Sequence, residues 1–382
     1  MHTTLLITAP GALTMVQDLG RRGWRRYGVP GAGALDGGLL RIANALAGNA
    51  EGAPALEFFL AGPTLQAVDA PVQLGLAGDF AVTLQRGSER SVLASWRSIT
   101  LQPGDSLRVG PLRSGRIGYI AATGLTVPLV LGSAATYTRA RLGGVAGRPL
   151  ATGDRLVVAA LPPPPPGSPP AERVLVQAPT TYDGPIRVVP GPQDDHFDDA
   201  AWAAFLGATY RVSRDADRMG LRLEGAAPLQ HRPDKGAEIV SDAAVPGAIQ
   251  VPGNGLPIVL LADGQTVGGY PKIATVASAD LARLASLPHL SMQALWTLWD
   301  EHFPRRPGHH HRTYLESRLA YKIQESAFGG LSPAIRQKLE KIGETGLIPG
   351  HDKQADSRLV PGTVLMREFN GLEHHVHILP DH

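Results

Sequence analysis

Short apolar or alternating runs, separated by Gly, Pro, Asn and Asp, fill the chain from Leu5 to about Val158. They include the stretches TLLITAP, VQLGLAG, FAVTLQ, SLRVG, RIGYIAATG and RLVVAA. Runs of this length, bounded by turn residues, are typical of β-strands. The pattern therefore predicts a β-rich unit over residues 1–160, built as a barrel or a sandwich.

One amphipathic helix interrupts this β pattern, in the stretch LDGGLLRIANALAG. Asp36 can cap its start and Gly48 can end it, because short polar side chains accept the first free N–H groups and Gly tolerates a left-handed backbone. Apolar residues recur at helical spacing on one side between them: Leu39, Leu40, Ala43, Leu46 and Ala47. We expect this helix to close one mouth of the β unit.

A proline-rich stretch, PPPPPGSPP, marks a boundary after the first unit. Proline cannot donate a backbone hydrogen bond, so this stretch predicts an extended spacer within a linker at 161–184. The β pattern resumes at IRVVPG and continues to Val276, with one helix expected around 198–210. The sequence thus predicts a second β lobe over 185–287.

Beyond Ser286 the apolar residues recur every three or four positions, which predicts amphipathic helices over 288–382. The stretches are LSMQALWTLWDEHF, HRTYLESRLAYKIQESAF and LSPAIRQKLEKIG. Most of the 13 histidines lie beyond Pro288. Without Cys, and without a histidine pair fixed one helical turn apart, they favour a solvated surface over a metal site.

Composition narrows the class of protein. A chain of 382 residues can form two or three domains. The formal net charge is +2 and no long run of Lys or Arg occurs, so neither nucleic acid nor a membrane surface is indicated as a partner. There is no cysteine, which excludes disulfides and thiol nucleophiles. No secretory signal pattern and no apolar stretch of ~18 residues is present, so we expect a soluble cytoplasmic protein.

The run VPGAIQVPGNGLPIVLLADGQTVGGYPKIATV, Val245 to Val276, mixes turn-formers and polar residues with strand residues. Its glycines, including Gly268 and Gly269, let the backbone approach a ligand closely. Polar side chains could then face a shared cavity: Gln250, Asn254, Asp263, Gln265 and Lys272. The alternative is that Gly and Pro only form tight turns between strands, and composition alone favours it.

Three further polar clusters carry candidate chemistry. VVPGPQDDHF places Asp195 beside a second aspartate and a histidine, which suits acid–base work or a divalent cation, although a solvated loop explains it equally and metal binding is not favoured. RDADRMG offers Arg218. QDLGRRG joins Asp18 to Arg21, which is either a clamp for a carboxylate or phosphate or a buried pair that anchors the lobe. GxGxxG, P-loop, GxSxG and HExxH patterns are absent from the sequence.

Several stretches together resemble the C subunit of bacterial ATP-dependent 5-oxoprolinase, a family also labelled allophanate hydrolase subunit 2. They are TAPGALTMVQDLGRRGWRRYGVPGAGALD, ANALAGN, ALEFFLAGPTL, PGPQDDHF, RDADRMGLRLEG and the run from Ser241 to Val276. The resemblance runs from about residue 5 to 287, and it extends to part of the carboxyltransferase domain of urea carboxylase. It implies tandem cyclophilin-like β-barrel lobes, a mainly β fold followed here by a mainly helical segment.

The resemblance also implies an activity and partners. In that family three subunits, A, B and C, couple hydrolysis of ATP with magnesium to opening of the 5-oxoproline lactam, giving glutamate. Phosphorylation of the lactam oxygen would make its carbon electrophilic enough for water. In the urea carboxylase relatives a comparable pair of lobes transfers a carboxyl group from carboxybiotin to an amide nitrogen. Relatives that pair with a B-type subunit also act as antagonists of a kinase inhibitor, a non-enzymatic alternative.

Residue roles follow from the resemblance as hypotheses. Ligand oxygens would accept hydrogen bonds from the amides of the long motif, from its Gly-Gly backbone and from Tyr270: Gln250, Asn254, Gln265, Gly268 and Gly269. Lys272, Arg21 or Arg218 would neutralise a carboxylate or phosphate. Candidates for the catalytic base or a metal contact are Asp18, Asp195 and Asp263.

The chain departs from the family after SADLARLASLPHL, where an expected Gly-Asp turn and closing strand are missing. From about residue 284 it instead resembles an uncharacterised family of small helical proteins associated with phage or recombinase genes. The chain therefore looks like a fusion in which the second lobe lacks its final strand. An unpaired sheet edge would favour aggregation unless another segment covers it.

Overall fold

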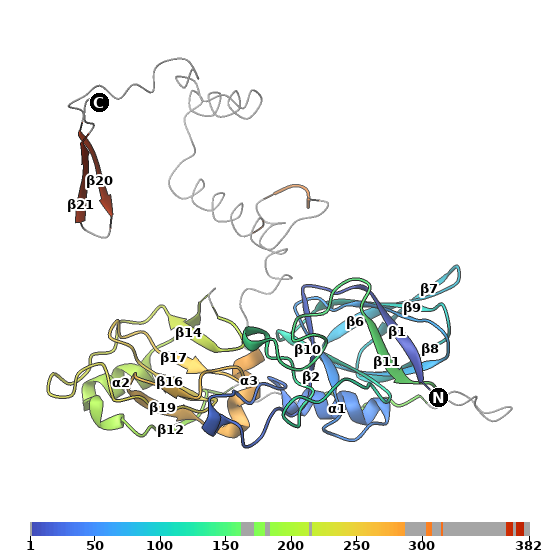
Figure 1. Ribbon diagram of the computed structural model, residues 1–382, viewed down its shortest axis with the longest axis horizontal. Helices are drawn as coiled ribbons and strands as arrows, with labels where there is room; N and C mark the ends of the chain where they lie inside the picture. Colours follow the sequence, from blue (N-terminus) through green and yellow to red (C-terminus); the bar gives the residue numbers. More distant parts are fainter. Residues whose placement is uncertain are drawn as a thin grey trace, which may run out of the picture. The chain divides into compact units, whose positions relative to one another are not determined.

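The computed structural model describes residues 2–161, 172–179, 184–213, 216–286, 303–307, 315, 364–369 and 372–377. It divides into two compact units, Met1–Thr297 and Leu298–His382. The first unit contains two β lobes (Figure 1). The prediction of a mainly β chain with few helices is confirmed.

The first lobe is made of two antiparallel sheets that share one apolar core. One sheet has the strand order β11 (Arg155–Ala159), β1 (His2–Ala9), β4 (Thr64–Ala67), β9 (Ser106–Leu112), β6 (Phe80–Arg86) and β7 (Glu89–Ala94). The other has the order β2 (Leu13–Gln17), β3 (Ala55–Phe59), β10 (Ile117–Ala122), β5 (Val72–Ala77) and β8 (Arg97–Leu101). Fully buried side chains from both sheets, such as Leu65 and Leu74, fill the space between them.

The predicted helix is confirmed as α1 (Gly37–Ala47), but its position differs from the prediction, since it covers the outer face of the five-stranded sheet and not a mouth of the lobe (Figure 1). Its start is capped by Asp36, whose side chain accepts a hydrogen bond from the Leu39 N–H at 2.9 Å. Gly48 ends it with a left-handed backbone at φ 81°. Both capping residues therefore act as the sequence predicts.

The second lobe contains one six-stranded antiparallel sheet and a small two-stranded ribbon. The sheet has the order β12 (Val188–Pro190), β19 (Lys272–Val276), β16 (Ala248–Gln250), β17 (Ile258–Leu260), β14 (Gly220–Glu224) and β13 (Arg211–Val212). The ribbon pairs β15 (Asp242–Ala243) with β18 (Val267–Gly268). Helices α2 (Asp199–Gly207) and α3 (Leu281–Ser286) pack against the apolar core of this sheet.

The predicted linker is described only in part, since the polyproline stretch lies outside the described residues. The residues that follow it run along β8. The Ser98 N–H donates to the Arg173 carbonyl at 2.7 Å, and the Leu175 N–H donates to the Trp96 carbonyl at 2.8 Å. This segment therefore pairs with the edge of the first lobe.

Most of the segment 288–382, for which the sequence predicts helices, lies outside the described residues. What is described is an antiparallel hairpin of β20 (Val364–Phe369) and β21 (Leu372–His377). This hairpin contradicts the helical structure that the sequence pattern predicts for that part of the chain. In the described part of the chain, no helix combines the length and the hydrophobicity that crossing a bilayer requires.

A buried carboxylate, Asp280, links the beginning and the end of the second lobe through its hydrogen bonds to Arg187, and it allows a test of how stability depends on pH. Asp280, fully buried in the short 3-10 helix η4 (Ser278–Asp280), accepts hydrogen bonds from the Arg187 N–H at 2.8 Å and from its guanidinium at 2.9 and 2.8 Å. These bonds hold the pKa of Asp280 well below its usual range. Asp280 therefore stabilises the fold above the pKa of an unfolded aspartate, about 4, and this contribution is lost as the pH falls below that value.

We expect Asp280→Asn to lower the melting temperature at neutral pH, because the neutral amide cannot replace the charge-assisted bonds to Arg187. The difference in melting temperature between this variant and the unsubstituted protein should become smaller at about pH 3. Thermal unfolding at neutral pH and at about pH 3 measures this difference. Asp234→Asn is the control, since Asp234 is exposed and its ion pair among the described residues is with Arg232 on the surface. A gap that widens in acid would contradict the assignment.

Candidate functional site

One arginine joins the two lobes. Arg218, just before β14, is buried and reaches across to the first lobe. Its Nε and Nη2 donate to the two carboxylate oxygens of Asp263 at 3.1 and 2.9 Å, and its Nη1 donates to Glu57 of β3. Its Nη2 also donates to the Gly33 carbonyl at 2.5 Å. We call Glu57, Arg218 and Asp263 the interlobe ion network, in which each lobe supplies a carboxylate to one guanidinium.

Glu57 is completely buried and its second oxygen is also occupied. That oxygen accepts hydrogen bonds from the Leu35 N–H at 2.9 Å and from the Tyr119 hydroxyl, which itself accepts one from the Asp36 N–H at 3.0 Å. Desolvation raises the pKa of Glu57 above its usual value, although Arg218, Tyr119 and Leu35 partly offset this. Burial lowers the pKa of Arg218, but the charges of Glu57 and Asp263 raise it by more than burial lowers it. The pKa is therefore above its usual value and the guanidinium stays charged.

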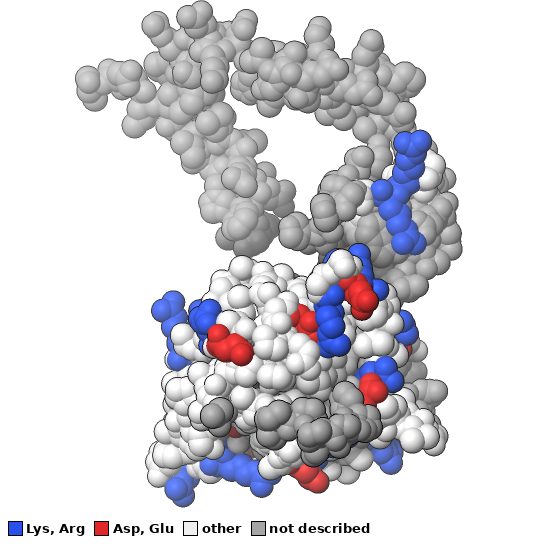
Figure 2. All heavy atoms as spheres, turned by 90° about the vertical axis from the view of Figure 1, so that its right-hand side faces the viewer, with Lys and Arg blue, Asp and Glu red and all other residues white. Residues whose placement is uncertain are grey.

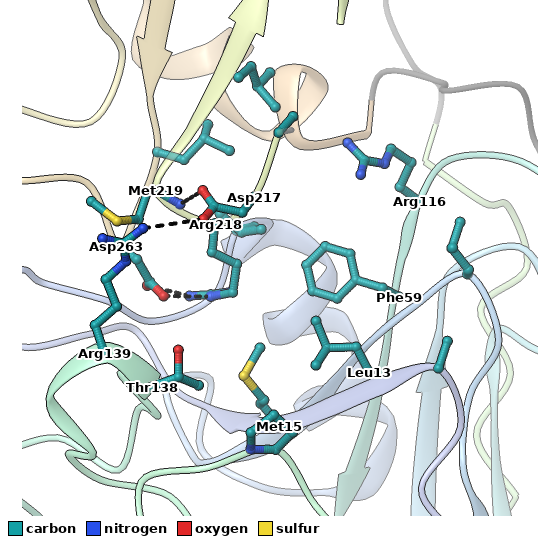
Figure 3. A pocket seen from close by; sticks show the side chains of 17 residues that line it. Leu13, Met15, Phe59, Arg116, Thr138, Arg139, Asp217, Arg218, Met219 and Asp263 are labelled. Atoms are coloured by element: carbon teal, nitrogen blue, oxygen red, sulfur yellow. Dashed lines mark hydrogen bonds and ion pairs between the residues drawn. The ribbon is translucent and has the colours of Figure 1, made fainter. Parts of the chain in front are cut away.

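A cavity of about 480 Å³ lies beside this network, between β2 and β3 of the first lobe and the β14 region of the second (Figure 3). Apolar side chains form most of its wall: Leu13, Met15, Leu35, Phe59, Leu60, Leu221 and Leu261. Polar groups reach it from both lobes: Arg116, Thr138, Arg139, Asp217, Arg218 and Asp263. We call it the interlobe cavity. Its size and its mixture of apolar wall and few polar groups are typical of small-molecule sites.

A second polar cluster lies on the second lobe, where β16 and β19 pair. Gln250 and Lys272 are partners in the register, and both are buried. Lys272 Nζ lies 3.0 Å from an Asp242 carboxylate oxygen, to which Gln193 Nε2 also donates at 3.1 Å. Gln265 Nε2 donates to Gln250 Oε1 at 2.9 Å. We call these five residues the ribbon cluster, because Asp242 belongs to the β15–β18 ribbon.

Gly268 lies directly against the ribbon cluster. A Cβ at that position would overlap the amide nitrogen of Gln250. The sequence predicts that the glycines of this motif let the backbone approach a ligand. In this protein Gly268 lets the backbone approach a buried side chain instead, which keeps Gln250 in place.

The sequence-predicted residues fall into several places. Arg218 and Asp263 line the interlobe cavity, while Gln250, Gln265, Lys272 and Gly268 meet at the ribbon cluster. Gly269 follows in the same segment and Tyr270 is partly exposed. The loop from Leu261 to Thr266 connects the two places, since it carries both Asp263 and Gln265.

Asp18 and Arg21 lie elsewhere, against the segment 130–135 of the first lobe. Asp18 accepts hydrogen bonds from the Ser133 hydroxyl and the Ala134 N–H, both at 2.7 Å. Arg21 donates to the Val130 carbonyl at 3.1 Å and to that of Ala135. These contacts fit the anchoring alternative.

Asp195 and Asn254 lie on the surface. Asp195 pairs with Lys235 at 2.6 Å, and Asn254 accepts a hydrogen bond from the Leu256 N–H at 3.1 Å within its own turn. Their catalytic and ligand-binding roles stay predictions.

Three residues that complete these sites have no role predicted from the sequence: Glu57, Asp242 and Arg25, whose Nη2 donates to the Gln265 carbonyl at 3.2 Å. Glu57 lies in an apolar strand of sequence ALEFF, and nothing in that local sequence indicates that the glutamate forms an ion pair. Arg25 is one of four arginines between Arg21 and Arg26, and nothing in the sequence separates it from its neighbours.

Surface charge adds little to this picture. Figure 2 shows one face on which, among the described residues, Lys and Arg side chains are scattered and mixed with Asp and Glu. The two lobes are joined by the buried pair of Arg218 with Glu57 and by an exposed pair, in which Arg139 Nη2 lies 3.8 Å from a carboxylate oxygen of Asp217.

Fold and sequence together define a carboxyltransferase-type protein. The family described as carboxyltransferase domain, subdomain A and B, matches residues 27–291, and the chain belongs to this family. Within it, the chain is 38% identical over 289 residues to the 5-oxoprolinase C subunit of Escherichia coli (strain K12), covering 74% of this chain and 88% of that protein. The same protein of Haemophilus influenzae (strain ATCC 51907 / DSM 11121 / KW20 / Rd) is 35% identical, with 71% and 84% covered.

Other relatives are larger proteins. Urea amidolyase of Saccharomyces cerevisiae (strain ATCC 204508 / S288c) is 30% identical over 304 residues, which cover 75% of this chain but 16% of that protein. Among solved structures, TTHA0988 is 37% identical with a TM-score of 0.63, and Kluyveromyces lactis urea carboxylase is 31% identical with a TM-score of 0.65. Each match covers 75% of this chain, and the chain spans 53% of the first solved chain and 26% of the second.

A second family, a protein of unknown function named DUF2924, matches residues 281–382. The two resemblances expected from the sequence are thus confirmed, including the change of family near residue 284.

Proposed function

We propose that this chain acts as the C subunit of an ATP-dependent 5-oxoprolinase, which opens the lactam of 5-oxoproline to glutamate together with A and B subunits. The observation that carries the proposal is its 38% identity to a 5-oxoprolinase C subunit over 88% of that protein's length. The two bacterial relatives bearing this name are matched over most of their length, whereas the urea amidolyases are matched over a small part.

The interlobe cavity supports a small substrate. Its apolar wall, with Met15 and Phe59, can pack against the ring of a lactam, and its volume of about 480 Å³ is more than large enough to admit such a molecule. Asp263, which is held in place by Arg218, would orient the polar edge of the ring, and the surrounding leucines would limit access of water. In this proposal the chain binds and positions the lactam.

The same cavity does not fit ATP. A triphosphate needs cations that are free to bind it, and the described arginines that line the cavity already have partners. Arg218 is held by Glu57 and Asp263, and Arg139 lies 3.8 Å from Asp217. Among the described residues, no group of three His, Asp or Glu side chains has the arrangement of a metal site. We therefore assign no nucleotide or magnesium step to these residues.

The assembled enzyme tests the function. Purified full-length chain is mixed with matching A and B subunits, and ADP release is measured with and without 5-oxoproline, beside a copy ending at residue 287. Release that depends on 5-oxoproline and on all three subunits supports the proposal. A B subunit that binds the chain without any turnover contradicts it and favours a regulatory role.

Similarity to urea amidolyase and to the carboxyltransferase family supports a second function, transfer of a carboxyl group from carboxybiotin to urea or another small amide. The same mixture distinguishes the two. Turnover that requires a biotinylated partner and bicarbonate favours the carboxyltransferase.

Gln265→Ala should reduce turnover of the assembled enzyme by about tenfold or more, since loss of a hydrogen bond that orients a ligand-binding amide is worth about 1–2 kcal/mol. Its melting temperature should change little, because Gln265 is only partly buried. Gln230→Ala removes an exposed glutamine whose amide donates only to the Pro228 carbonyl nearby, and it is the matched control. If melting temperature and activity of the Gln265 variant fall in step, its role is structural.

A further inference from the structure

Two residues that contact Gln265 each have a buried N–H donor without a partner among the described residues. Arg25, in the short 3-10 helix η1 (Arg25–Tyr27) of the first lobe, donates through Nη2 to the carbonyls of Gln265, at 3.2 Å, and Ala244. The Gln265 side chain donates to Gln250 Oε1. Within the described part of the chain, Arg25 Nη1 and Gln250 Nε2 are both buried and have no hydrogen-bond partner.

Buried polar groups in folded proteins nearly always have hydrogen-bond partners. Two unpartnered donors on residues that both contact Gln265 therefore need an explanation. Both are N–H groups. The missing partner is therefore an acceptor, such as a carboxylate, a carbonyl or a water molecule.

The charges around these donors select among those acceptors. Lys272 is neutralised by Asp242 at 3.0 Å. Arg25 has no carboxylate within ion-pair distance among the described residues, and burial lowers its pKa without any compensating charge. The ribbon cluster together with Arg25 therefore carries one positive charge that is not balanced, which a ligand with a single negative charge would balance.

We propose that Arg25 and Gln250 form a subsite for the carboxylate of a small substrate, built against Gln265 from both lobes. A carboxylate has two oxygens in a plane and one negative charge, which matches the donors and the charge of the site. The inference rests on the proposed function, because 5-oxoproline carries one carboxylate next to its lactam. Asp263, at the interlobe cavity, is two residues from Gln265, so their backbones lie within about 7 Å.

The alternative is a purely structural role. Arg25 holds the carbonyls of Ala244 and Gln265, which follow β15 and precede β18, and so fastens the base of the ribbon. A structural clamp would stabilise the ribbon equally with or without a carboxylate. A carboxylate subsite would stabilise it more when the ligand is present.

Hydrogen exchange of the full-length chain separates these roles. Exchange of peptides covering 242–250 and 264–272 is followed while acetate is added, with acetamide as the neutral probe of the same shape. The protein is compared with Arg25→Gln and Arg25→Lys, and with Arg26→Gln as the matched control. Arg26 is on the same turn but exposed, with its guanidinium 4.9 Å from the Tyr27 ring centroid.

We expect acetate, but not acetamide, to slow exchange in the unsubstituted protein and in Arg26→Gln. Arg25→Gln should raise the acetate concentration needed for half of this effect by about tenfold or more, which is the loss of one hydrogen bond to a charged group. Arg25→Lys keeps the charge but loses the fork of N–H groups. The acetate concentration that it needs for half of the effect should therefore lie between those of the unsubstituted protein and Arg25→Gln. It also serves as the test if Arg25→Gln does not fold.

If acetate does not slow exchange in the unsubstituted protein, the subsite is overturned and the structural clamp remains. The same conclusion follows if acetate slows exchange equally in the unsubstituted protein and in both Arg25 variants. This result does not depend on turnover. An assembled enzyme that ignores 5-oxoproline while acetate still protects the two peptides would refute the proposed function and leave the carboxylate subsite standing. If turnover is present, Arg25→Gln should raise KM for 5-oxoproline by a similar factor.

Discussion

Replacing Arg218 with methionine should lower the free energy of unfolding by about 3–5 kcal/mol. Methionine has a similar length and no charge, so it fills the space while leaving Glu57 and Asp263 without their cation. Glu57 is completely buried, and no water can solvate it there. The expected loss is mainly the free energy of a carboxylate left buried and unpaired, and only in small part the attraction between the ions.

Denaturant unfolding at neutral pH measures this loss, and a double-substitution cycle identifies its cause. Combining Arg218→Met with Glu57→Gln removes the stranded charge, so the double variant should be more stable than Arg218→Met alone. Arg139→Met is the control, because Arg139 lines the same cavity but its side chain is 63% exposed and lies 3.8 Å from Asp217. A surface pair of this kind is worth about 0–1 kcal/mol. Equal losses for Arg139→Met and Arg218→Met would contradict the interlobe ion network.

Local pattern was enough to predict the elements that depend on neighbouring residues. The helix α1, its cap at Asp36 and its end at Gly48 are all encoded within a dozen positions, where apolar spacing and capping chemistry act together. The alternation of short apolar runs likewise predicted two β lobes. Strand pairing could not be predicted in the same way, since β11 joins β1 across most of the first lobe.

The candidate sites depend on contacts between residues far apart in the chain. Glu57 and Arg218 are 161 positions apart, and Arg25 and Gln265 are 240 positions apart. No local period or motif reports such a contact, so a glutamate in an apolar strand reads only as an exception to the pattern. The long motif did mark Gln250, Gln265 and Lys272 as polar residues near one another, and the register of β16 and β19 brings two of them together.

The role of glycine shows why residue type alone could not decide the site. The sequence predicts that Gly268 lets the backbone approach a ligand, whereas in the structure the backbone at Gly268 lies against the side chain of Gln250. Both uses require the same thing, the absence of a Cβ. Which one applies depends on what the fold places opposite the backbone.

Adding a single methyl group at Gly75 should destabilise the first lobe by about 1–3 kcal/mol or more. Gly75 lies in β5 directly beneath α1, and a Cβ there would fall well inside contact distance of the Ala43 carbonyl, 2.5 Å from the Ala47 nitrogen and 2.9 Å from the Leu46 Cβ. These are mainly backbone atoms of a helix, which cannot turn aside as a flexible side chain can. In Gly75→Ala the helix must therefore move away from the sheet.

Gly207→Ala is the matched control, because Gly207 is the last residue of α2 and a Cβ there meets nothing within 4 Å. Alanine at that position should leave stability unchanged or raise it by up to about 1 kcal/mol. The loss in Gly75→Ala should also reach the interlobe ion network, since the Asp36 N–H at the start of α1 donates to Tyr119, which donates to Glu57. Faster hydrogen exchange at 33–36 together with a lower unfolding midpoint would show this coupling. An unchanged midpoint would mean that α1 does not pack directly on β5.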